Sequence, residues 1–571
     1  MSRASSPVEA APADLEVEWQ FDAADLDAVE RWLWAPPATL EARVIARGEQ
    51  RLEDTYYDTA DRMVARAGFT LRLRRRAARD PEVTLKATTA APAGNGPRMR
   101  TELSATAKRG FEERDAIEGR CGEVLRALVG TKHLEPLFEV HTARRVFDVT
   151  LADETAIEVA LDRTRVCHDR REVQIARVEL ELTGGTHETA EAFAKALRRA
   201  LELKPAGWSK FGAGAALARL DPPEAVLESL VPGPRTFRRR ATAHEAARAA
   251  LRGQLAALLT HEPAARLGVD PEGVHQMRVA TRRLRAGIRL FRDALPPDWS
   301  EARQELRWLA GALGVVRDLD VQLESLEAWA RDAEADPEEH TARVEVVRHL
   351  ETRRTEARDA LLAALDSPRY TALVEALTSH LRPRPRRPAL RLRVRMRVPP
   401  EVRRDARRIA EALGAFVAAA DGPRARDDVR RFGRRELRKA HRGFARPARA
   451  LHPDARPEAY HAVRIKAKRL RYAAEFLAPL YGRDGKRFIE AMKELQDRLG
   501  DHQDAYVAEA QLRTLAEEAT ALPPRAIFSM GELAAERRDG AVRLRRGVPR
   551  DLRRVDRRWR KLRRRARRLA R

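Results

Sequence analysis

One basic segment occurs twice in the chain, and this repeat constrains the fold more than any other feature of the sequence. The segment VHQMRVATRRLRAGIRLFRD (274–293) is echoed by YHAVRIKAKRLRYAAEFL (460–477). An offset of 186 residues aligns His275 with His461, and it also aligns Asp318 with Asp504. Because the match extends well beyond the basic segment, we expect two similar halves that form one domain.

Helical spacing places the basic residues of the first copy on one face, at intervals of four, three, four and three residues. Met277, Leu284 and Ile288 follow the same rhythm on a neighbouring face, as a packed amphipathic helix requires. A solvated face is the ordinary alternative for a basic helix, but no acid lies between Glu272 and Asp293 to relieve the repulsion. Guanidinium groups match phosphate oxygens, so the stripe favours a polyanion. The residues expected to bind it are His275, Arg278, Arg282, Arg285 and Arg289, followed by His461, Arg464, Lys468 and Arg471.

The doubled segment, the L-G-x-x-R-D-L-D motif from Leu313 and the late Trp559 resemble the CHAD family. The resemblance covers about residues 236–571. It implies a helical bundle of two similar halves, about 236–380 and 400–571, that binds inorganic polyphosphate. The proline- and arginine-rich residues 380–400 are expected to connect the halves over the groove, and Leu552, Val555, Trp559 and Leu562 predict a last helix.

The charge of the chain is unevenly distributed. Residues 1–220 hold 34 Lys and Arg against 36 Asp and Glu, whereas the remainder holds 77 against 50. The sequence shows neither a signal-peptide pattern nor an apolar run of membrane-span length, and Cys121 and Cys167 are isolated. We therefore expect a cytoplasmic protein with reduced thiols and no membrane partner, and association with polyphosphate granules is a further expectation.

Several N-terminal segments alternate polar and apolar residues, as strands with two different faces do. Three pairs of like charge share a strand face: Glu16 with Glu18, Arg72 with Arg74, and Glu179 with Glu181. A half-exposed sheet shows the same alternation. In a closed barrel, however, the acids would face inward to hold divalent cations, and the arginines would face inward to hold phosphates. The pattern is therefore compatible with metal-assisted phosphoryl transfer.

Six motifs in order resemble the CYTH family: L-E-V-E from Leu15, T-Y-Y-D-T, G-F-T-L-R-L-R, T-L-K, V-E-L-E-L and W-S-K-F-G. The resemblance implies an eight-stranded antiparallel barrel, residues 14–220, that hydrolyses triphosphate with Mg²⁺ or Mn²⁺. The proline-containing residues 221–235 are expected to form a linker to the all-α bundle, residues 236–571, so the whole protein is expected to be α+β.

The same resemblance assigns site residues. The metal ligands would be Glu16, Glu18, Glu179 and Glu181. The triphosphate ligands would be Arg72, Arg74, Lys86, Arg144 and Lys210. Arg145 stays an alternative to Arg144, since the facing of the strand decides between them, and Asp162 and Glu102 match further acidic positions. The sequence assigns no catalytic residue.

The family motif E-x-E-x-K is altered in this chain, because Gln20 stands where the family has lysine. Glutamine can still form hydrogen bonds but lacks the positive charge of lysine. The substitution Gln20→Lys is therefore expected to raise the rate of tripolyphosphate hydrolysis. The first hypothesis is a metal-dependent hydrolase of tripolyphosphate or related short phosphate anhydrides, with a polyphosphate-binding CHAD domain. The alternative is a non-catalytic polyphosphate-binding protein with a weakened barrel. Nucleic acid is expected to bind only nonspecifically, through the basic charge of the chain. Aromatic residues make up 5% of the chain, which argues against recognition by base stacking.

Overall fold

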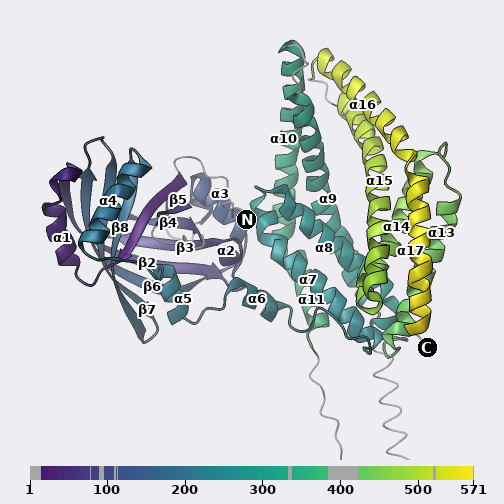
Figure 1. Ribbon diagram of the computed structural model, residues 1–571, viewed down its shortest axis with the longest axis horizontal. Helices are drawn as coiled ribbons and strands as arrows, with labels where there is room; N and C mark the ends of the chain where they lie inside the picture. Colours follow the sequence, from purple (N-terminus) through teal and green to yellow (C-terminus); the bar gives the residue numbers. More distant parts are fainter. Residues whose placement is uncertain are drawn as a thin grey trace, which may run out of the picture. The chain divides into compact units, whose positions relative to one another are not determined.

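The computed structural model describes residues 14–77, 79–88, 96–107, 111, 114–331, 337–383, 422–518 and 522–569. Two compact units are present (Figure 1), one of Met1–Leu230 with Glu262–Gly273 and one of Val231–His261 with Val274–Arg571. Most of the expected connector, from residue 384, and the expected start of the second half at residue 400 lie outside the described residues.

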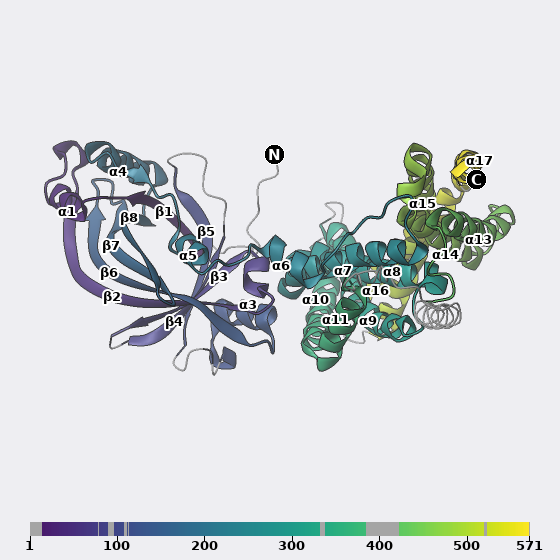
Figure 2. The same cartoon turned by 90° about the horizontal axis from the view of Figure 1, so that it is seen from below.

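Eight antiparallel strands close into a barrel in the first unit, which confirms the predicted fold class. They are β1 (Leu15–Asp22), β2 (Arg43–Thr59), β3 (Phe69–Arg76), β4 (Arg79–Ala87), β5 (Arg98–Thr106), β6 (Leu134–Thr150), β7 (Ala156–His168) and β8 (Arg171–Gly184). Their order is β5-β4-β3-β2-β6-β7-β8-β1, and β1 pairs again with β5 to complete the ring. Strands β2, β6, β7 and β8 lie side by side in the wall seen in Figure 2. A short strand, β9 (Lys204–Pro205), pairs with β1.

The apolar side chains of the barrel face outward and are covered by helices. On β1, Trp19 and Phe21 are buried in a cluster with Leu33 of α1 (Leu26–Trp34) and Phe193 of α4 (His187–Ala200). Elsewhere on the wall, α2 (Met63–Arg66) and α3 (Gly119–Val129) contribute to a second cluster with β3 and β4. Since alternate residues of a strand point to opposite faces, this outer packing directs Glu18 and Gln20 inward.

Two short helices follow the barrel strands. Helix α5 (Lys210–Leu217) begins after Ser209, whose hydroxyl accepts a hydrogen bond from the Gly212 amide. At Gly214 a Cβ atom would lie 2.1 Å from the ring of Phe138, so the glycine allows α5 to pack closely on β6. Helix α6 (Pro223–Leu230) lies within the segment that was expected to be a linker.

The second unit is helical, and its elements correspond between the two halves of the repeat. The first half contains α7 (Ala243–Leu267), α8 (Pro271–Leu290), α9 (Trp299–Ala330), α10 (Pro337–Asp366) and α11 (Pro368–Leu381). The second contains α13 (Val429–Arg449), α14 (Pro457–Phe476), α15 (Ala478–Glu518), α16 (Pro524–Arg545) and α17 (Val548–Leu569). Helices α8 and α14 hold the two copies of the basic segment, and α15 is kinked at Gly482, where φ is 54°.

The core of the helical unit uses the predicted apolar stripes. Leu284 on α8 and Leu470 on α14 are fully buried. The halves meet where Phe291 stacks on Phe432 with ring centroids 5.6 Å apart. Trp559 is also buried on α17, which confirms the predicted last helix. In the described part of the chain, no helix is both long enough and apolar enough to cross a bilayer.

Candidate functional site

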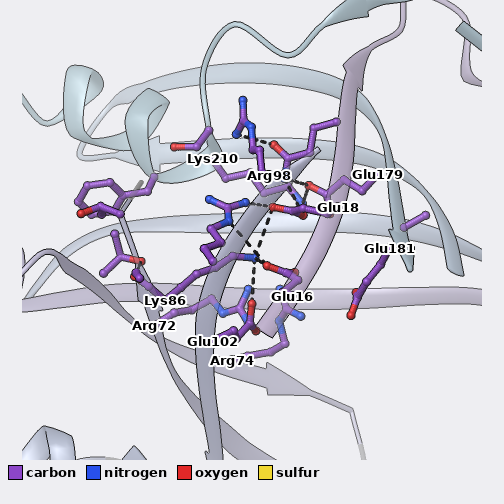
Figure 3. A pocket seen from close by; sticks show the side chains of 18 of the residues that line it. Glu16, Glu18, Arg72, Arg74, Lys86, Arg98, Glu102, Glu179, Glu181 and Lys210 are labelled. Carbon is purple, nitrogen blue, oxygen red and sulfur yellow. Dashed lines mark hydrogen bonds and ion pairs between the residues drawn. The ribbon is translucent and has the colours of Figure 1, made fainter. Parts of the chain in front are cut away.

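A cavity of about 290 Å³ lies inside the barrel, and every residue predicted for the metal and triphosphate sites lines it. Strand alternation explains this convergence, because β1, β3, β4, β6 and β8 each turn one face inward. The predicted residues that line the cavity are Glu16, Glu18, Arg72, Arg74, Lys86, Arg144, Glu179, Glu181 and Lys210. Figure 3 shows that acidic and basic side chains face one another across it.

The paired glutamates come from neighbouring strands. In the β1–β8 ladder Glu18 lies opposite Glu181 and Gln20 lies opposite Glu179, so both pairs share the inner face. Glu16 forms an ion pair with Lys86, and burial is the main cause that raises the pKa of Glu16. Glu18 is 3% exposed and pairs with Arg100 of β5. The negative charge of β1 is therefore balanced by basic side chains of β4 and β5.

Glu181 differs from the other predicted metal ligands. Among the described residues it has no ion pair, and in Figure 3 it stands apart from the dashed contacts. Burial and the nearby charges of Glu16, Glu102 and Glu158 raise the pKa of Glu181 to about 7. Glu181 therefore lacks a paired cation among the described residues, and a bound metal ion would favour the ionised form of its carboxyl group.

The donor chemistry of the four glutamates fits Mg²⁺ or Mn²⁺, since hard divalent cations prefer carboxylate oxygens. The side chains are not gathered into a coordination sphere, because no three acidic, histidine or cysteine side chains of the described residues converge tightly enough to hold a metal. The carboxylates are instead paired with basic side chains. Lys86, for example, contacts Glu18 at 3.7 Å and Glu102 at 2.9 Å.

The basic side chains are fixed by buried acids. Arg74 donates two hydrogen bonds to Asp54, at 2.7 and 2.8 Å. Arg144 donates two to Asp162, both at 2.7 Å, and Lys210 contacts the same carboxylate. Since Asp162 is fully buried behind them, it orients both cations toward the cavity.

Glu179 forms ion pairs with two of these cations. Arg144 donates to it at 2.5 Å, and Lys210 lies 3.1 Å away. Burial alone would raise the pKa of Glu179, but Lys210 and Arg144 outweigh burial and hold that pKa well below its ordinary value. The structure also separates the two arginine alternatives, since Arg145 pairs with Asp27 and Glu30 of α1 on the outer wall while Arg144 lines the cavity.

Two acids that the sequence matched to further family positions contribute differently. Glu102 lines the cavity, where Lys86 and Arg72 outweigh the effect of burial and lower the pKa of Glu102 to about 2. Asp162 instead supports the cations from behind.

Sequence reasoning missed three charged residues that line the cavity: Arg98, Arg100 and Glu158. Arg98 and Arg100 alternate with Glu102 along β5, so the same period of two that revealed the other strands could have found them. Gln20 connects this strand to the acids. Its amide donates to Glu18 at 2.9 Å and to Glu179 at 3.4 Å, and its carbonyl oxygen accepts from Arg98 at 2.9 Å.

A second cavity, of about 1050 Å³, lies in the helical unit between the two halves of the repeat. We call this cavity the groove. Five of the nine predicted polyanion ligands line it: His275, Arg278, Arg282, Arg464 and Lys468. Helices α9 and α15 add Arg317 and Arg498, together with the acids Asp318, Asp501 and Asp504.

The other four predicted ligands do not line the groove. Arg471 donates to Gln496 and to Glu475, and His461 bonds to Gln503. Burial lowers the pKa of Arg285 and of Arg289, with contributions from neighbouring arginines such as Arg303 and Arg469. The basic stripe is longer than the groove, so only five of the nine predicted residues line it.

Lys468 is the most perturbed cation of the groove. Burial and the charges of Arg464, Arg282 and Arg278 lower its pKa to about 8, although Asp504 acts in the opposite direction. Such crowding of like charge from both α8 and α14 is costly without an anion to neutralise it.

Comparison with known proteins agrees with this architecture. A CYTH domain model matches residues 25–211, and a CHAD domain model matches residues 249–513. Uncharacterized protein Rv2226 of Mycobacterium tuberculosis (strain ATCC 25618 / H37Rv) is 30% identical over 531 residues, which cover 89% of this chain and 90% of that protein. The crystal structure of the CHAD domain from the plant Ricinus communis is 27% identical, covers 56% of this chain and 93% of that chain, and has a TM-score of 0.43. The chain belongs to the family of proteins in which a CYTH domain is followed by a CHAD domain.

Proposed function

We propose that the barrel hydrolyses a phosphoanhydride bond of inorganic triphosphate or a related short chain, and that the helical unit binds inorganic polyphosphate. The observation that carries the proposal is the barrel cavity, in which seven lysine and arginine side chains face a group of carboxylates. A volume of about 290 Å³ suits a small, highly charged anion. Phosphoryl transfer needs this combination, because catalysis rests on positioning and charge stabilisation.

The cations would bind the phosphate oxygens. Arg74 and Arg144 are each held by two hydrogen bonds to a buried aspartate, so their positions are fixed before a ligand arrives. Such preorganised donors stabilise charge without having to reorganise during the reaction. Lys210 extends this set from the first residue of α5.

Glu16, Glu18 and Glu181 would hold the divalent cation, and Glu181 is the strongest candidate because it has no ion-pair partner among the described residues. When bound, the cation would polarise a phosphoryl oxygen and neutralise part of the triphosphate charge. Glu179 is better placed to orient Arg144 and Lys210, which it already contacts.

The groove supports the second part of the proposal. Arg278 and Arg282 of α8 line it together with Arg464 and Lys468 of α14, so cations of both halves face the same space. A linear polyanion can contact several of them in succession, whereas a single phosphate cannot.

Phosphate release from tripolyphosphate, ATP and thiamine triphosphate, measured with and without Mg²⁺ or Mn²⁺, tests the enzymatic part. We expect metal-stimulated release from tripolyphosphate or another of the three. Arg144→Gln should lose this activity, whereas Arg145→Gln, changed at the adjacent outward-facing position, should keep it. Absence of release with either metal from all three substrates would contradict the proposed activity.

One observation favours the non-catalytic alternative. Gln20 donates hydrogen bonds to both Glu18 and Glu179, so it occupies oxygens of two predicted metal ligands. A barrel of this kind could bind anions without turnover. Metal-free calorimetry with tripolyphosphate, followed by a phosphate-release assay with metal, distinguishes the cases, because the alternative predicts binding in the first experiment and no hydrolysis in the second.

A further inference from the structure

Arg98 is electrostatically different from the other cations of the barrel cavity. Each of the other six forms at least one ion pair with a carboxylate. Within the described part of the chain, Arg98 has no such pair. Its guanidinium donates instead to two neutral acceptors, the Gln20 side-chain oxygen at 2.9 Å and the Ala206 carbonyl at 3.2 Å.

The placement of Arg98 follows from the strand register. Arg98 lies directly opposite Glu18 where β5 pairs with β1, so its side chain shares the inner face with Glu18 and Gln20. Arg177, buried behind this corner and paired with Asp22, adds positive charge. Burial and the charge of Arg177 lower the pKa of Arg98, although the charges of Glu179 and Asp22 act in the opposite direction. An arginine nevertheless stays protonated at neutral pH.

Gln20 and Arg98 are chemically matched. The amide nitrogen of Gln20 donates to the two glutamates, and this orientation turns its oxygen toward Arg98. A lysine at position 20 has no acceptor and would place an ammonium group against the guanidinium. The glutamine therefore permits a cation on β5 that a lysine on β1 would repel.

We propose that Arg98 contacts a phosphate group in the cavity and supplies, from β5, the positive charge that the E-x-E-x-K motif places at residue 20. The inference rests on the proposed function for its ligand. It changes the meaning of Gln20, which becomes the residue that holds Arg98 in place and no longer marks a missing charge.

Calorimetric binding of tripolyphosphate without metal, followed by hydrolysis with metal, tests this role. Arg98→Gln should weaken binding about tenfold or more, as expected for loss of a charged hydrogen-bonding partner. Arg98→Lys should keep most of the affinity because it keeps the charge. Arg75→Gln, an exposed arginine on β3, is the matched control and should bind as the wild type does.

The reciprocal change separates this proposal from the simple loss of a charge. Gln20→Lys in the otherwise unchanged chain should not improve binding, because the new ammonium repels Arg98. In the Arg98→Gln background, Gln20→Lys should restore binding, and this rescue also shows that the variant folds. A rise in affinity for Gln20→Lys alone, or wild-type binding by Arg98→Gln, would overturn the role of Arg98 while leaving the proposed function intact. A wild-type protein that neither binds nor hydrolyses tripolyphosphate would overturn both.

Discussion

Arg464 donates a hydrogen bond to Asp504 across 3.2 Å, and the equivalent residues of the first half, Arg278 and Asp318, form an ion pair at 3.5 Å. The repeat thus reproduces a contact as well as a motif. Both acids line the groove and are more than half exposed. Each neutralises a cation that we propose to bind phosphate, so the groove contains its own competing anions.

Removing these acids should strengthen polyphosphate binding. Asp318→Asn and Asp504→Asn each free an arginine and remove a negative charge that repels phosphate. Because exposed ion pairs are weak, we expect a gain of about two- to fivefold for each change. Titration with long-chain polyphosphate at low salt measures the gain, which should shrink at high salt. Glu345→Gln, an acid of α10 paired with Arg348, is the control. Unchanged or weaker affinity in the double variant would exclude competition by these acids.

The groove also predicts which part of the basic stripe matters. Replacing both Arg278 and Arg282, or both Arg464 and Lys468, by glutamate should weaken polyphosphate binding strongly. The slope of log affinity against log salt should fall by roughly one for each phosphate that the variant no longer neutralises. Arg285→Glu with Arg289→Glu is the matched comparison, since these residues lie on α8 but outside the groove. Equal losses of affinity in the two sets would mean that the ligand follows the whole stripe.

Duplex DNA at equal phosphate concentration is the control for generic basicity. A groove between the two halves of the repeat should prefer a single narrow chain, whereas a nonspecific basic surface binds both polymers by counterion release. Comparable affinity for DNA and polyphosphate at physiological salt would favour the simpler interpretation, in which α8 and α14 present solvated basic faces and no specific site.

Alternation within strands and the resemblance to the CYTH family together carried the sequence prediction of the barrel and its interior. The period of two paired Glu16 with Glu18 along one strand, and the resemblance assigned Glu16, Arg72 and Glu179 to one site, which the closed barrel brings into one cavity. Arg98 was not predicted as a site residue, because none of the six CYTH-like motifs includes it. Its importance emerges only when the ion pairs of the neighbouring cations are known, and these depend on the register between β1 and β5.

The helical stripe was harder to predict for a geometric reason. A helix of twenty residues is longer than the groove that it lines. Side chains on a single face of the helix therefore lie in different environments, some in the groove and some outside it. The acids absent from the first basic segment are supplied by other helices. Asp318 of α9 pairs with Arg278, and Glu475 of α14 pairs with Arg283. Spacing within one segment cannot reveal such partners.

Binding to the groove should depend on pH through Lys468. The groups that face it are Arg464, Arg282, Arg278 and Asp504, and together with burial they set its pKa at about 8. Below that pH the ammonium is charged and contributes to binding. Affinity should therefore fall as the pH rises above about 8, by an amount on the order of 1 kcal/mol. Lys468→Arg should remove this dependence, because arginine keeps its charge. A persistent fall in that variant would assign the titration to another group.

Substitutions of two predicted metal ligands should have separable effects. Glu181→Gln removes an acid that has no ion-pair partner among the described residues. The variant should lower the rate of metal-stimulated hydrolysis by about a hundredfold or more. It should have little effect on metal-free tripolyphosphate binding. Glu18→Gln should also abolish hydrolysis, but it releases Arg100 from its ion pair and should strengthen metal-free binding. Phosphate release and calorimetry on the same preparations measure both effects, and thermal unfolding checks the fold. Full hydrolysis by both variants would remove Glu18 and Glu181 from the metal site.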